Sequence, residues 1–324
     1  MKHQPESDVR TVEFQLLDGV RVSDGQWSAK LGNAAQPLTF LAALCLAEGH
    51  QLTKRELAEW IWDDGPRTPG FDEMLDSLAR TVRFALRGSS EPNSARAADP
   101  LPKARGNAGY YQLAVEPVEV DVLRFRSLAN SAREAAGRDP AEAANFYRSA
   151  LDVWPGRGGT LFGGVPLRGL PGKRAQEYRE LLQREHRAVL VDYLDLQLAQ
   201  NANPGLVEEL TRLAQTDDGR RDADVVRLLM CAHQQRGDLL RALTVYQNME
   251  AGLRLDDRAR RLRQLYESIR RSVDSADDPA GKPDAAATDR TPSGGRSATF
   301  VNHQYGPDAR NYQAETIHYR ESDS

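Results

Sequence analysis

The chain has 324 residues, with 43 lysines and arginines against 47 aspartates and glutamates, and a net charge of −4. This balance excludes a chain that is basic throughout, as a general nucleic-acid or membrane-surface binder would be, but it allows a local basic patch. No apolar run approaches the about 18–20 residues that cross a bilayer. Residues 1–10 are polar and lack the apolar stretch of a signal peptide, so we expect a cytoplasmic protein without a membrane partner.

Short antiparallel strands are predicted over residues 11–31. Apolar and polar residues alternate in this segment, and Asp-Gly occurs twice, at Asp18 and Asp24. Asp-Gly supplies the positive φ angles of tight hairpins, so the segment is expected to fold back on itself.

Two helices follow the strands. Leucines at helical spacing predict a buried first helix that stops at Gly49. Thr53 and Glu56, three residues apart, then form the capping box of a second helix, whose apolar face carries Leu57 and Trp60.

A third helix and a hairpin complete this part of the chain. The apolar face of the third helix has spacings of four, three and four residues: Leu75, Ala79, Val82 and Leu86. Its arginines fall together on a neighbouring face. After a flexible insertion, the stretch "LPKARGNAGYYQL" (Leu101–Leu113) predicts a Gly-rich turn and a short strand.

The order of strands, three helices and a hairpin is that of a winged helix with an additional N-terminal sheet. In that architecture the third helix enters the major groove of DNA and the hairpin lies on the backbone beside it. The candidate base contacts are Arg80, Thr81 and Arg83, and the candidate phosphate contacts are Lys103, Arg105 and Asn107. The full set of predicted DNA-binding residues is Ser77, Arg80, Thr81, Arg83, Arg87, Lys103, Arg105 and Asn107.

Acidic residues at the start of the third helix oppose this interpretation. Asp72, Glu73 and Asp76 stand there, and residues 10–116 hold 12 basic against 14 acidic side chains. Acidic groups near phosphates are repelled, and phosphate neutralisation supplies most non-specific affinity for DNA. The alternative is that Asp72 and Glu73 stabilise the helix macrodipole. Both interpretations stay open at this point.

From about residue 117 to 271 the pattern is almost wholly helical and contains an internal repeat. "RDPAEAANFYRSAL" and "GDLLRALTVYQNM" share Asp, Ala and Tyr at four-residue steps: Asp139, Ala143 and Tyr147, then Asp238, Ala242 and Tyr246. A small residue one turn before an aromatic ring lets neighbouring helices approach closely, as in tetratricopeptide helix pairs. The seven arginines of residues 254–271 indicate either a solvated terminal helix or a basic face.

Residues 272–297 are rich in Asp, Pro, Gly and Ala and predict a disordered linker, because they cannot bury enough apolar surface to order themselves. No Walker-type glycine loop, metal-ligand spacing or nucleophile motif occurs in the sequence. We therefore expect no cofactor, no metal and no enzymatic activity.

Residues 12–269 resemble the SARP family of actinobacterial transcriptional activators. The resemblance lies in "LTKRELAEWIWDD", "RTVRFALRG", "GYYQL", "FYRSALDVWPG" and "HQQRGDLLRALTVYQNM" and in their order along the chain. It implies an OmpR-like winged helix followed by a bacterial transcriptional activation domain, sequence-specific promoter binding and recruitment of RNA polymerase. If the chain belongs to that family, the absent glycine loop predicts a small member without an ATPase.

The tail, residues 298–324, resembles RHIM-like amyloid-signalling motifs of bacteria. Amide side chains could form ladders and apolar ones steric-zipper contacts. The candidate assembly residues are Asn302, Gln304, Gly306, Asn311, Tyr312, Gln313, Ala314 and Ile317. The alternative is a disordered tail or a hairpin that docks on its own protein.

These observations predict a mainly α protein. A winged helix (11–116) precedes an all-α tetratricopeptide-like domain (117–271), a disordered linker and a short β-prone tail. The predicted function is a DNA-binding transcriptional regulator that activates promoters, with double-stranded DNA and RNA polymerase as partners and homo-oligomers through the repeat domain or the tail. The alternative is an interaction adaptor with a degenerate DNA-binding domain, whose tail assembles with a signalling or defence effector.

Overall fold

The computed structural model divides the chain into two units, Met1–Asp278 and Pro279–Ser324. All of the residues that it describes belong to the first unit. They are residues 12–23, 28–29, 31, 34–63, 70–87, 101, 109–155, 164–200, 205–216, 219, 221–249 and 257–276. The predicted assembly motif of the tail lies outside them, as do Lys103, Arg105 and Asn107.

The predicted N-terminal hairpin is present. β1 (Glu13–Gln15) pairs antiparallel with β2 (Arg21–Ser23), with Phe14 opposite Val22. Gly19 has a φ of 84° in the turn between them, a conformation that the Asp-Gly pair was expected to supply. Phe14 and Val22 are both buried, so this small sheet contributes one face to the core.

The three helices of the predicted winged helix are also present, and the fold class is confirmed. They are α1 (Ala35–Leu46), α2 (Lys54–Trp62) and α3 (Phe71–Arg87). The capping box forms as predicted: the Thr53 amide donates to the Glu56 carboxylate at 2.8 Å, and the Glu56 amide donates to Thr53 Oγ1 at 3.2 Å. The predicted end of the first helix was wrong. α1 ends at Leu46, because Gly49 (φ 61°) belongs to a separate short turn, Glu48–His50.

The strand of the stretch Leu101–Leu113 pairs with a segment that the sequence pattern did not single out. β4 (Tyr110–Gln112) lies antiparallel to β3 (Gln51–Thr53), which directly precedes α2. Tyr111 stands opposite Leu52. This pairing holds the chain that follows α3 against the start of α2.

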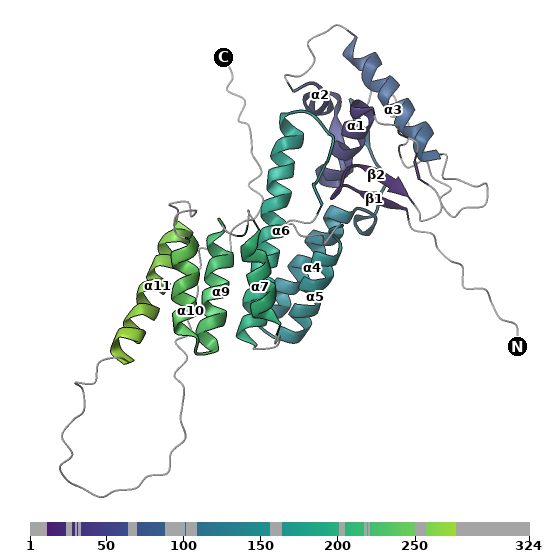
Figure 1. Ribbon diagram of the computed structural model, residues 1–324. Helices are drawn as coiled ribbons and strands as arrows, with labels where there is room; N and C mark the ends of the chain where they lie inside the picture. Colours follow the sequence, from purple (N-terminus) through teal and green to yellow (C-terminus); the bar gives the residue numbers. More distant parts are fainter. Residues whose placement is uncertain are drawn as a thin grey trace, which may run out of the picture. The chain divides into compact units, whose positions relative to one another are not determined.

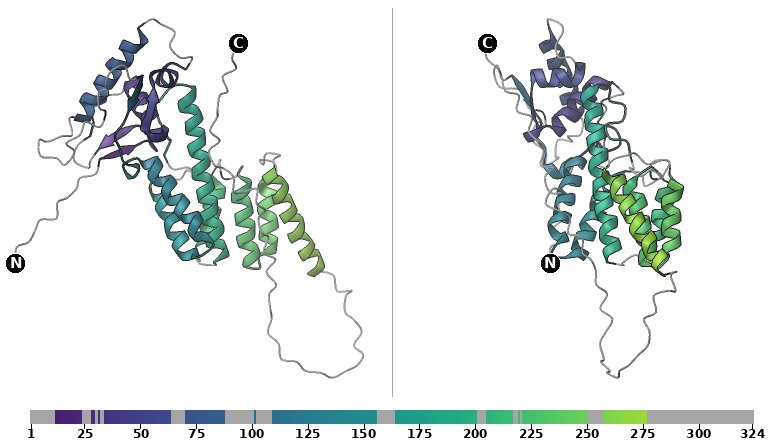
Figure 2. Two further views of the ribbon diagram at one scale, coloured as in Figure 1. Left: turned by 180° about the vertical axis from the view of Figure 1, so that it is seen from behind. Right: turned by 90° about the vertical axis from the view of Figure 1, so that its left-hand side faces the viewer.

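A helical array follows. Its members are α4 (Asp121–Ala136), α5 (Pro140–Asp152), α6 (Lys173–Ala199), α7 (Leu206–Gln215), α9 (Ala223–Gln235), α10 (Leu239–Met249) and α11 (Asp257–Ala276). Consecutive helices pack side by side as α4 with α5, α9 with α10 and α10 with α11 (Figures 1 and 2). α11 runs to Ala276, so the segment predicted as a linker begins with helix at Ser272–Ala276.

The internal repeat marks equivalent packing positions in this array. Ala143 and Tyr147 of α5 are buried, as are Ala242 and Tyr246 of α10. The Asp139 carboxylate caps α5 by accepting from the amides of Ala141 and Glu142, both at 3.0 Å.

One hydrophobic core joins the winged helix to the first half of the array. It extends from Val12 through α1, α2 and α3 to Val189 in α6, and two smaller clusters fill the space between the later helices. α6 is the longest described helix, and both views show one of its ends beside α2 and its other end in the array (Figures 1 and 2). Across the described parts of the chain, no helix combines the length and apolar character that a membrane span requires.

Candidate nucleic-acid interface

α3 has the two-sided character that a groove-binding helix needs. Its predicted apolar face is buried in full: Leu75, Ala79, Val82 and Leu86. Ser77, Arg80 and Thr81 are exposed on the other side of the helix. The Thr81 hydroxyl donates to the Ser77 carbonyl at 3.1 Å, one turn earlier. Three of the predicted DNA-binding residues therefore share an exposed face.

Arg83 lies differently from the other predicted base contacts. Its side chain is half-buried, and its Nε donates to the Leu101 carbonyl at 2.8 Å. Leu101 is fully buried, so this bond ties α3 to the start of the stretch Leu101–Leu113. Helical spacing predicts on which side of a helix a residue lies, and it therefore grouped Arg83 with Arg80. It does not predict which distant group a side chain will bind. The side chain of Arg87 lies outside the described residues.

Two of the three acidic residues at the start of α3, Asp72 and Asp76, have partners inside the protein. Lys54 Nζ lies 3.2 Å from an oxygen of Asp72 and 3.7 Å from an oxygen of Asp76. The Tyr111 hydroxyl donates a short hydrogen bond to Asp76. Burial and the Asp76 carboxylate raise the pKa of Tyr111, so this phenol stays protonated and remains a donor.

This network gives Asp72 and Asp76 a structural role that sequence reasoning missed. They connect α3 to the first residue of α2 and to β4, and Lys54 offsets part of their charge. The i, i+4 spacing of Asp72 and Asp76 already indicated that the two carboxylates lie side by side on α3. Nothing in the sequence indicated that Lys54 would face them.

A second set of contacts fixes α6 on the winged helix. The Lys173 amide at the start of α6 donates to Asp63 Oδ1 at 2.6 Å, and Arg174 pairs with Glu59 at 2.5 Å. The rings of Trp60 and Tyr178 lie 5.0 Å apart between the same helices. Aromatic pairs at this separation are stabilising beyond their buried area.

Asp121, the first residue of α4, ties the array to the N-terminal hairpin. One of its carboxylate oxygens accepts from the amides of Leu16 and Leu17, at 2.8 and 3.0 Å. Nearby, Arg124 pairs with Glu13 at 2.9 Å. Burial raises the pKa of Asp121 to about 6, although the backbone amides favour its charged form.

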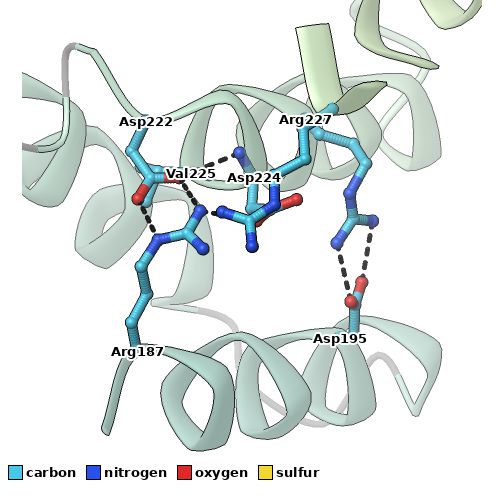
Figure 3. Close-up of polar contacts among 7 residues, drawn as sticks. Arg187, Asp195, Asp222, Asp224, Val225 and Arg227 are labelled. Carbon is cyan, nitrogen blue, oxygen red and sulfur yellow. Dashed lines mark hydrogen bonds and ion pairs between the residues drawn. The ribbon is translucent and has the colours of Figure 1, made fainter. Parts of the chain in front are cut away.

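Arginine–aspartate pairs hold α9 on α6, as Figure 3 shows. Arg187 binds Asp222 with two nitrogens, at 2.5 and 2.6 Å, and also binds Asp224 at 2.5 Å. Arg227 binds Asp195 with two nitrogens, at 2.9 and 2.6 Å. Burial opposes the charge of Asp222, but the Arg187 guanidinium outweighs it and holds the pKa of Asp222 below its usual range.

The helical array matches a known family. The model of the bacterial transcriptional activator domain matches residues 120–270. Residues 120–270 are a bacterial transcriptional activator domain. Together with the winged-helix elements that precede this domain, the match bears out the resemblance to the SARP family of regulators.

Two curated proteins are similar in sequence to this chain. The regulatory protein AfsR of Streptomyces coelicolor is 29% identical over 243 residues, which are 74% of this chain and 22% of that protein. AfsR of Streptomyces griseus is 26% identical over 277 residues, which are 84% of this chain and 26% of that protein. The chain thus spans about a quarter of the length of these relatives.

The structure of Mycobacterium tuberculosis EmbR in complex with a low affinity phosphopeptide shares the fold. Its TM-score is 0.64 at 19% identity, over 81% of this chain and 65% of that one. At this identity the likeness concerns the fold alone.

Proposed function

We propose that this SARP-family chain binds double-stranded DNA through α3 and activates transcription from the bound promoter. The observation that carries the proposal is the exposed face of α3 with Ser77, Arg80 and Thr81, opposite a fully buried face. A helix of this kind fits the major groove, where an arginine can donate two hydrogen bonds to a guanine.

Asp72 and Asp76 of α3 do not argue against this role, because their charge is partly offset within the protein. Lys54 lies within 4 Å of Asp72 and Asp76, and the hydroxyl of Tyr111 binds Asp76. Arg80 lies one turn beyond Asp76 and is exposed. In this proposal Lys103, Arg105 and Asn107 contact phosphates, as the sequence predicts.

The shared core supports a function for the activator domain. Since α6 packs against α2 and Asp121 binds the N-terminal hairpin, the domain has a fixed direction relative to α3. We propose that DNA binding thereby presents the array to RNA polymerase or to a second copy of the chain. The adaptor alternative depends on the tail and remains a prediction from sequence.

Fluorescence anisotropy of the full chain with DNA from upstream of its gene and of neighbouring genes tests the proposal. We expect saturable binding that prefers one fragment and weakens with salt. Arg80→Ala should lower affinity for the preferred fragment by about 5-fold to 150-fold, the effect of losing one bidentate base contact of roughly 1–3 kcal/mol. Arg221→Ala is the matched control, because Arg221 is an exposed arginine of the activator domain.

Equal and weak binding to every fragment would reject sequence-specific recognition. If binding is specific, run-off transcription on the preferred fragment tests activation. Transcript yield that does not rise with added protein would reject the activator role while leaving DNA binding intact.

A further inference from the structure

The most exposed large apolar side chain of the described residues lies on the candidate DNA-binding helix. Phe84 of α3 is 80% exposed, although single exposed apolar residues elsewhere on a protein need no explanation. The position of Phe84 on this helix, however, does require an explanation. Phe84 follows Leu75 by nine residues, or about 2.5 helical turns, so the two side chains leave the helix on opposite sides. Leu75 is fully buried, and Phe84 therefore points straight away from the core.

Phe84 shares its face with the polar residues of the proposed site. Positions 77, 80, 81 and 84 are separated by steps of three or four residues, which places their side chains side by side. Ser77, Arg80 and Thr81 are exposed as well. The ring thus lies on the surface that α3 would turn toward the floor of a groove.

We propose that Phe84 reads thymine through its C5-methyl group in the major groove. This inference rests on the proposed function. Among the four bases, only thymine presents an apolar group on the floor of the major groove, and phenylalanine is one of the side chains that contact it. A ring beside Arg80 and Thr81 would therefore add a preference for A·T pairs next to the positions that the polar side chains read.

The expected gain comes from the removal of two apolar surfaces from water. One buried methyl group accounts for about a fourfold change in affinity, which corresponds to ~0.8 kcal/mol. This contact carries no charge, so it should not alter the salt dependence of binding.

Replacing thymine by deoxyuridine removes only the methyl group and tests the proposal whatever the sequence of the operator. The DNA fragment that the full chain prefers is amplified with dUTP in place of dTTP, and both forms are titrated by anisotropy. We expect the wild-type chain to bind the uracil form at least about fourfold more weakly. Phe84→Ala should bind both forms equally. Met74→Ala should keep the wild-type ratio, because Met74 is a partly exposed apolar residue near the other end of α3.

Three results of the titrations and of sedimentation would overturn the inference while leaving the proposed function in place. They are equal wild-type affinity for the two forms, an unchanged ratio in Phe84→Ala, and a loss of oligomer mass in Phe84→Ala by sedimentation, which would assign the ring to a protein contact. Urea unfolding of Phe84→Ala should match the wild type, because the ring is exposed; a lowered midpoint would show that the ring packs within the protein, and would also overturn it. Absence of specific binding by the wild-type chain would instead reject the proposed function itself.

Discussion

Asp121 offers a direct test of how the winged helix and the activator domain are joined. The carboxyl is 5% exposed and accepts from the amides of Leu16 and Leu17 in the hairpin and of Val122 in its own helix. Burial raises its pKa from 3.8 to about 6. Because the folded chain holds this proton more tightly than the unfolded one, the stabilisation is complete below pH 3.8 and is lost as the pH rises through about 6.

The size of this effect follows from the shift. Each pKa unit corresponds to about 1.36 kcal/mol, so a shift of about two units changes the free energy of unfolding by about 3 kcal/mol. Asp121→Asn has nearly the same shape but does not titrate. We therefore expect the variant to gain about 3 kcal/mol relative to the wild type between about pH 4 and pH 7. Urea unfolding of both full chains, followed by tryptophan fluorescence, measures this difference.

The comparison with the variant cancels the contributions of all other titrating groups. A wild-type minus variant difference that stays flat from about pH 4 to pH 7 would refute the reasoning, because a buried carboxyl at this junction must titrate in that range. Asp121→Ala supplies a second measurement. It leaves the amides of Leu16 and Leu17 without their acceptor, which costs about 1–3 kcal/mol for each buried donor at any pH.

The remaining predictions concern the helices on either side of this junction. Thr53→Ala removes the N-cap of α2 and should lower the free energy of unfolding by about 1 kcal/mol in urea, whereas Thr53→Ser should keep most of this stability. Arg187→Ala leaves Asp222 without its counter-ion and leaves Asp224 with only Arg258, whose Nε lies 3.6 Å from it, and should cost about 3–5 kcal/mol; a loss below about 1 kcal/mol would mean that solvent screens the pairs. Ala242→Leu should separate α10 from its neighbours and cost about 1–3 kcal/mol in urea unfolding, since this position is fully buried, whereas the same change at the exposed Ala141 should be neutral. Lys54→Met should weaken DNA binding in the anisotropy assay without unfolding the chain, because Asp72 and Asp76 then face the phosphates without Lys54; unchanged affinity would place α3 farther from the DNA backbone.

Much of the secondary structure and one face of the candidate site could be predicted from the sequence. Helical spacing found the buried and exposed sides of α3, the Thr53–Glu56 pair found the start of α2, and the Ala–Tyr repeat found equivalent buried positions in α5 and α10. These features are local, because each depends on residues within one or two turns of each other. The same local logic failed at β3, since a three-residue strand exists only through its partner β4.

Contacts between distant residues were decided by the tertiary structure. Spacing along α3 grouped Arg83 with Arg80, but folding brings the Leu101 carbonyl to Arg83 and leaves Arg80 exposed. From the sequence, the first turns of α3 are acidic. Folding brings Lys54 to Asp72 and Tyr111 to Asp76.

The sequence by itself determined the order of the elements and which side of each helix is apolar, because propensity, capping and periodicity act over a few residues. Only the tertiary structure decided that the winged helix and the activator domain share one core from Val12 to Val189 and that Asp121 joins them. The physical reason is that a buried polar group must find its partner wherever the fold places one, and sequence distance does not limit that choice.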